Sequence, residues 1–153
     1  MYSRQEAAQL RQEFWTAFGQ YMVPVLSSEG ERVNWVNYIT GEKNIAFRME
    51  AGNRKQWIGI EISHKDPGIR QLYFDQLAQF KKLLVQETGE KWRWEPLMVD
   101  DHGRTTCRVF IELNEGSIFR KEDWPLLISF FKQRIIALDA FWNQVKYAFD
   151  SLR

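Results

Sequence analysis

Apolar residues recur every three or four positions over residues 123–151, and this spacing predicts one long C-terminal helix. Asp123 and Pro125 supply its start, because Asp caps free backbone donors and proline is tolerated in a first turn. The stripe is rich in aromatic residues and consists of Leu127, Phe131, Ile135, Leu138, Trp142, Val145 and Phe149. A stripe of this kind packs against a core, so the helix is expected to be a structural element.

Two further segments show helical spacing. Ser3 and Glu6 have the spacing of a capping box and precede a predicted helix over about residues 4–22. Asp66 and Pro67 begin the next segment and Gly89 ends it, so residues 66–89 predict one helix. Together with the C-terminal segment, the sequence predicts three helices.

Alternating apolar and polar residues predict the strands. Turn-rich links, AGNR and DDHG, predict two hairpins and therefore antiparallel pairing. The chain is expected to be one α+β domain over residues 1–153, in the order helix, three strands, helix, two strands, helix, with a mostly antiparallel sheet of about five strands. The expected strands are residues 33–39, 44–50, 56–63, 92–99 and 104–113, and residues 117–119 form a short extended segment.

The composition is that of an ordinary globular domain. Of the 153 residues, 44% are hydrophobic and 27% are charged, and the net charge is +1. A near-neutral charge argues against a protein that coats duplex DNA. The densest apolar run, residues 126–131, is far shorter than the roughly 20 residues of a membrane span. The N-terminal residues lack the apolar core of a secretory signal. We therefore expect a cytoplasmic location and no membrane partner.

Sequence motifs for catalysis are missing. The chain contains no glycine-rich phosphate loop, no HExxH, no GxSxG and no Glu-x-Lys or Asp-x-Lys pair of the restriction-nuclease type. Cys107 is the single cysteine and lies on the apolar face of its predicted strand, where a buried inert thiol is expected. The sequence thus predicts no catalytic residues and no cofactor, and it favours a binding protein over an enzyme.

A metal site is the alternative for the acidic residues at strand ends. Glu50, Glu61 and His64 combine carboxylate and imidazole groups, which ligate divalent cations where their geometry converges. His102, beside Asp100 and Asp101 in the acidic turn DDHG, offers another such grouping. The competing interpretation is that these side chains lie in solvated loops. The alternative function is therefore a metal-dependent hydrolase or nuclease.

The mixed faces of the predicted strands carry aromatic and arginine side chains. Arg48, Trp57, Trp94 and Arg108 are the candidate binding residues. Aromatic rings beside arginines suit stacked bases of a single-stranded nucleic acid or an aromatic-anchored protein interface. The competing interpretation is that a helix covers this face and the tryptophans, Trp92 included, belong to the core. Both partner classes stay open, and the aromatic helix also allows a homodimer.

Three segments resemble a known family: LRQEFWTAFGQYM (10–22), KQWIGIEISHKDP (55–67) and SIFRKEDWPLLISFFKQRIIALDAFWNQVKYAF (117–149). The chain is similar over nearly its full length to an uncharacterised bacterial domain-of-unknown-function family. Members of that family occur alone or behind a restriction-endonuclease-like domain. The resemblance implies a link to nucleic-acid processing or phage defence, and it supplies no catalytic residues.

Overall fold

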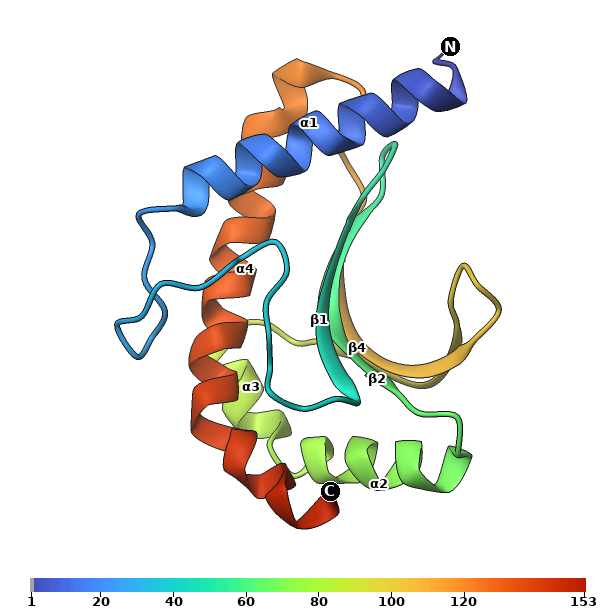
Figure 1. Cartoon of the computed structure of the whole chain (residues 1–153), viewed down its shortest axis with the longest axis vertical. Coiled ribbons are helices and arrows are strands. Elements are labelled where there is room, and N and C mark those ends of the chain that lie inside the picture. Colours follow the sequence, from blue (N-terminus) through green and yellow to red (C-terminus); the bar gives the residue numbers. More distant parts are fainter. Residues whose placement is uncertain (1) are drawn as a thin grey trace.

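Helices cover one face of a curved antiparallel sheet in the computed structural model, which describes residues 2–153 (Figure 1). The sheet has four strands in the order β1-β2-β4-β3. They are β1 (Ile45–Ala51), β2 (Gln56–Ser63), β3 (Arg93–Val99) and β4 (Thr105–Leu113). The helices are α1 (Arg4–Met22), α2 (Pro67–Ala78), α3 (Lys81–Thr88) and α4 (Trp124–Val145). The predicted α+β class and the antiparallel hairpins are confirmed.

The predicted aromatic stripe of the C-terminal helix is buried against this sheet. Its core residues include Leu127, Phe131, Ile135, Leu138 and Trp142, each at most 1% exposed. The helix ends earlier than expected, since residues Lys146–Leu152 form the 3-10 segment η2. Within residues 2–153, no helix combines the length and apolar character needed to cross a membrane.

Residues 33–39 do not form the predicted strand, so the sheet has four strands rather than about five. Local hydrogen bonds hold this segment as a loop: the Asn34 side chain accepts from the backbone N–H groups of residues 36 and 37. The Tyr38 hydroxyl donates to Asp139 of α4. Burial is the main cause that raises the pKa of Tyr38, and the hydrogen bond to Asp139 raises it further. The Trp142 indole donates to the Thr40 carbonyl over 2.7 Å. Trp35 of this segment is thus part of the core without belonging to a sheet, whereas Ile39 stays exposed.

The single helix expected over residues 66–89 is two helices, so residues 2–153 contain four α-helices instead of the predicted three. The chain bends at Phe80, whose φ of −108° and ψ of 19° interrupt the helical path. The bend lets α2 pack against η2 and the strands while α3 packs against α4. One apolar stripe therefore serves two neighbours. Of the segment 117–119, which was predicted to be extended, only Ser117 forms a bridge, to Asn53, whereas residues 118 and 119 form a turn.

Side-chain alternation gives the sheet two different faces. Ile58, Ile60 and Ile62 of β2 face the helices and are fully buried. Gly59, between them, pairs with Phe110, and a Cβ there would lie 2.4 Å from the Val109 carbonyl oxygen. Only glycine permits this close approach. The sheet curves away from the helices and its β3–β4 hairpin curls round, leaving a concave face that no helix of residues 2–153 covers (Figure 1).

Candidate functional site

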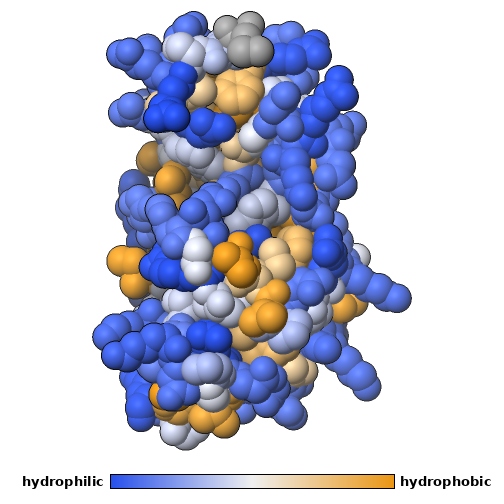
Figure 2. Space-filling view, turned by 90° about the vertical axis from the view of Figure 1, so that its right-hand side faces the viewer, coloured by the Kyte–Doolittle hydropathy of each residue, from blue (hydrophilic) through white to orange (hydrophobic). Residues whose placement is uncertain are grey.

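The concave face of the sheet is the candidate site. Figure 2 shows this side of the molecule as mostly hydrophilic, with hydrophobic residues gathered in and below its middle. It contains an open cavity of about 710 Å³ that reaches from Arg11 of α1 across Trp57 to Arg93 of β3. A second cavity of about 180 Å³ adjoins it and is lined by Trp57, Glu61 and residues of the β3–β4 turn. Both cavities share Glu50, Trp57, Asp101 and Arg108.

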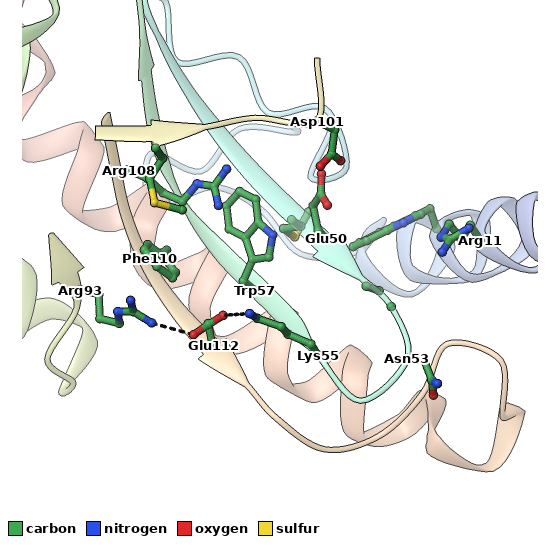
Figure 3. Close-up of a pocket in the computed structure, with 15 residues that line it drawn as sticks. Arg11, Glu50, Asn53, Lys55, Trp57, Arg93, Asp101, Arg108, Phe110 and Glu112 are labelled. Carbon is green, nitrogen blue, oxygen red and sulfur yellow. Dashed lines mark hydrogen bonds and ion pairs between the residues drawn. The ribbon is translucent and has the colours of Figure 1, made fainter. Parts of the chain in front are cut away.

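Trp57 stands at the centre of the larger cavity, on β2 (Figure 3). The guanidinium carbon of Arg108 lies 3.9 Å from the centre of its ring, which is a close cation–π contact. The ring of Phe110 meets Trp57 edge to face at 6.1 Å, and Arg93 covers Phe110 at 4.8 Å. These contacts hold the indole in place without covering it completely, since Trp57 stays partly exposed.

The arginines of this face are paired with carboxylates on neighbouring strands. Glu61, whose side chain is 7% exposed, accepts from Arg48 Nε at 3.1 Å and from Arg108 Nη2 at 3.5 Å. Glu112 is paired with Lys55 Nζ at 3.0 Å and with Arg93 Nη1 at 2.9 Å (Figure 3). The antiparallel register produces the first network, because Glu61 lies directly opposite Arg108. Arg48 and Arg108 are therefore already engaged within the protein.

Glu50 and Asp101 differ from the other carboxylates of the site. Their carboxylates point toward one another across the cavity (Figure 3). Burial is the main cause that raises the pKa of Glu50, and the Asp101 charge raises it further, against the opposing effect of Arg108. Among the described residues, the ion pairs of this face join other side chains. Within residues 2–153, neither Glu50 nor Asp101 is therefore in an ion pair, although both line the cavity.

The structure brings two of the three predicted metal ligands together. Glu50 and Glu61 line the smaller cavity, whereas His64 lines a different one at the strand ends. There His64 Nδ1 accepts a hydrogen bond from the Asp66 N–H over 2.9 Å. Across residues 2–153, no group of three or more His, Cys, Asp and Glu side chains is placed to hold a metal ion. In the turn at His102, Asp100 accepts from the backbone of residues 102 and 104 and so closes the hairpin.

Trp94 does not share the concave face, so that expectation was wrong. Trp94 pairs with Val109, whose side chain is in the core, and its ring meets Phe74 of α2 edge to face at 5.7 Å. On β3, Arg93 and Glu95 are the residues that face the concave side. Trp92 is also on the helix side, 7% exposed. The interpretation of the tryptophans as core residues therefore holds for these two and not for Trp57.

Asp101 is the site residue that the sequence pattern did not connect with Glu50. A register shift between Glu95 and Met98 bends the β3–β4 hairpin, and the bend carries Asp101 over the concave face. The sequence contains a hint of this irregularity in Pro96, because proline inside a strand marks an edge or a bulge. Residue spacing alone does not predict that the bend places Asp101 opposite Glu50.

A third cavity, of about 550 Å³ and with a basic lining, lies where β1 begins and β2 ends. Arg70 of α2 contributes to it and donates to the His64 carbonyl over 2.6 Å. None of the residues that line this cavity is a carboxylate. The lining consists of Lys43, Asn44, Ser63, His64, Lys65, Arg70, Arg104 and Thr105.

Comparison with known families gives one match. Residues 10–146 match the profile of a domain of unknown function, DUF4268. Neither the curated proteins nor the solved structures contain a significant match to the chain.

Proposed function

The chain belongs to the DUF4268 family, a domain of unknown function, and on that premise we propose that it is a non-catalytic binding module for a partner protein. The concave face takes up a positively charged side chain of the partner, arginine or lysine, between Glu50 and Asp101. One observation carries the proposal: in the part of the chain that the structure describes, two carboxylates that form no ion pair face each other beside an aromatic ring that a helix does not cover.

A cation from the partner offsets an unfavourable arrangement. Two nearby carboxylates repel each other, and partial burial weakens the solvation of Glu50. A guanidinium or ammonium group between Glu50 and Asp101 relieves that repulsion through charge-assisted hydrogen bonds. The indole of Trp57 adds a surface on which such a group or its aliphatic stem packs.

The same face suits phosphate less well. A phosphate reaching Arg48 or Arg108 has to compete with Glu61, which both arginines already contact. It also meets the charges of Glu50 and Asp101. Since affinity for nucleic acid depends on unneutralised cations, the concave face supports a protein partner better than a single-stranded nucleic acid.

Fluorescence anisotropy tests this proposal with a fluorescein-labelled peptide of alternating glycine and arginine at low salt. The wild-type protein should bind it, and the double variant Glu50→Gln/Asp101→Asn should bind at least about tenfold more weakly, a loss of about 1.4 kcal/mol. The matched control is Asp75→Asn/Glu87→Gln, which removes the same charges from the helices α2 and α3. Equal loss in both double variants would show only a general charge effect and would reject the site.

A second candidate is single-stranded nucleic acid at the basic cavity, and the carboxylate-free lining favours it. The suggested association of related domains with restriction-endonuclease-like domains and phage defence points to the same partner. A labelled oligonucleotide titrated against Lys43→Gln/Lys65→Gln tests this candidate. The metal-dependent hydrolase at Glu50, Glu61 and His64 has less support, because Glu61 is engaged by arginines and His64 lines another cavity.

A further inference from the structure

The two edges of the sheet are built differently. The edge strand β3 contains Pro96 and a register shift between Glu95 and Met98, and both features discourage the pairing of a further strand. The other edge strand, β1, pairs in continuous register with β2 from Ile45 to Ala51 and contains no proline. Only the β1 edge is therefore suited to receive another strand.

The backbone groups of Phe47 and Met49 point outward from this edge. Ser63 N–H donates to the Asn44 carbonyl over 2.9 Å, so alternate β1 residues, Arg48 and Glu50 among them, exchange hydrogen bonds with β2. The residues between them face away. Ile45 is satisfied there by Glu42 and Thr40. Within residues 2–153, the outward N–H and C=O groups of Phe47 and Met49 have no hydrogen-bond partner in the structure.

A groove of about 460 Å³ runs along this edge. One wall is Trp15 of α1 and the other is residues 36–39, where the Tyr38 ring stacks on Phe47 at 4.8 Å. Ile39 is 87% exposed in this wall. Trp15 and Met49 also line the large concave cavity, so the groove and the cavity are continuous around the edge of β1.

We propose that the outer edge of β1 binds an extended segment of a partner protein as an added strand. This proposal is independent of the proposed cation site, because it rests on the backbone groups of β1 and holds whether or not the concave cavity binds a cation. The groove lies along the edge of β1 between Trp15 and residues 36–39, a shape that suits one extended chain. A second copy of the protein would bring identical walls to the same edge, which favours a peptide segment over a homodimer.

The two faces of the edge define the chemistry of that segment. Side chains of the added strand alternate between the two faces of the sheet. Those on the helix side meet Trp15 and Tyr38, so apolar residues fit there. Those on the concave side meet Arg48 and Glu50, so an acidic residue opposite Arg48 and a basic residue opposite Glu50, two positions apart in the segment, are complementary.

The test starts with selection of phage-displayed random twelve-residue peptides on the wild-type protein. Met49→Pro removes the outward N–H and leaves the bonds to β2 intact, so it should fold and should lose peptide binding at least tenfold. The matched control, Met49→Ala, keeps the N–H and should bind within about threefold of the wild type. Should Met49→Pro fail to fold, amide hydrogen exchange on the wild-type protein replaces it.

Hydrogen exchange also identifies the contact directly. In the unbound protein the Phe47 and Met49 amides should exchange much faster than those of Arg48 and Glu50. A bound peptide should slow Phe47 and Met49 at least tenfold and leave the other two unchanged. Failure to select any peptide, or peptides that leave Phe47 and Met49 unprotected, would overturn the proposal. Sedimentation as a dimer with both amides already protected would overturn it in favour of a second copy.

Discussion

The guanidinium carbon of Arg108 lies 3.9 Å from the centre of the Trp57 ring, on the face of the sheet that the helices leave open. Arg108 sits on β4 and Trp57 on β2, so the contact crosses a strand pair in the middle of the sheet. Glu61 holds the same guanidinium at 3.5 Å. The contact fixes the orientation of the indole, and the two side chains together line the concave cavity.

Trp57→Ala should weaken binding of the glycine–arginine peptide by about tenfold, because a cation–π contact of about 1–2 kcal/mol is lost. Anisotropy titration measures the change. The control is Trp94→Ala, which removes a ring from the helix side of the sheet. Trp94→Ala should lower the melting temperature and leave the affinity of the folded protein unchanged. Equal affinity of Trp57→Ala and wild type would exclude the ring from the site.

Trp142→Ala should destabilise the fold by about 3–5 kcal/mol, as the loss of a large buried aromatic side chain does. The ring is 1% exposed, and its indole also satisfies the Thr40 carbonyl of the loop before β1. Urea unfolding measures the loss. Tyr147→Ala is the control, since that side chain is 70% exposed and should cost little. A stability of Trp142→Ala close to that of wild type would contradict the burial of the α4 stripe.

Gly59→Ala should destabilise the protein by about 1–3 kcal/mol through overpacking. The added Cβ would lie 2.4 Å from the Val109 carbonyl oxygen and 2.7 Å from the Phe110 Cβ, so β2 and β4 would have to separate. Chemical denaturation measures this loss in the free energy of unfolding. Ala46→Gly, a change of the same size on the neighbouring strand, serves as the comparison and should cost less than about 1 kcal/mol. An unchanged midpoint for Gly59→Ala would mean that the strands do not approach this closely.

Glu50→Gln should raise the melting temperature at neutral and alkaline pH and have little effect in acid. Burial and the Asp101 charge raise the pKa of Glu50 in the folded state. A raised carboxyl pKa contributes stability below the ordinary pKa, and this contribution is lost as the pH rises through the raised value. Glutamine mimics the neutral form at every pH. Melting curves from acid to alkaline pH test this, and Asp101→Asn should reduce the benefit of Glu50→Gln.

The helices and hairpins follow from periodicity because each pattern depends on neighbours in the sequence. Residues 33–39 also alternate, yet they form a loop, in which Tyr38 bonds to Asp139 and the next residue after the segment, Thr40, bonds to Trp142, both about a hundred positions away. Trp94 was assigned to the wrong face because period-two patterns fix the alternation of side chains and not which set meets the helices. The opposition of Glu50 and Asp101 depends on the bend of the β3–β4 hairpin, a tertiary feature that residue spacing does not encode.

The most direct test of the central claim is a two-dimensional NMR titration of the labelled protein with the glycine–arginine peptide. The account predicts that the Trp57 indole N–H and the backbone amides of Glu50 and Asp101 shift together with one dissociation constant. The indole N–H signals of Trp92 and Trp142, which lie on the helix side of the sheet, should not shift. Shifts confined to Lys43, Lys65 and Arg70, or spread along α4 with Trp57 unchanged, would contradict a cation-binding site on the concave face.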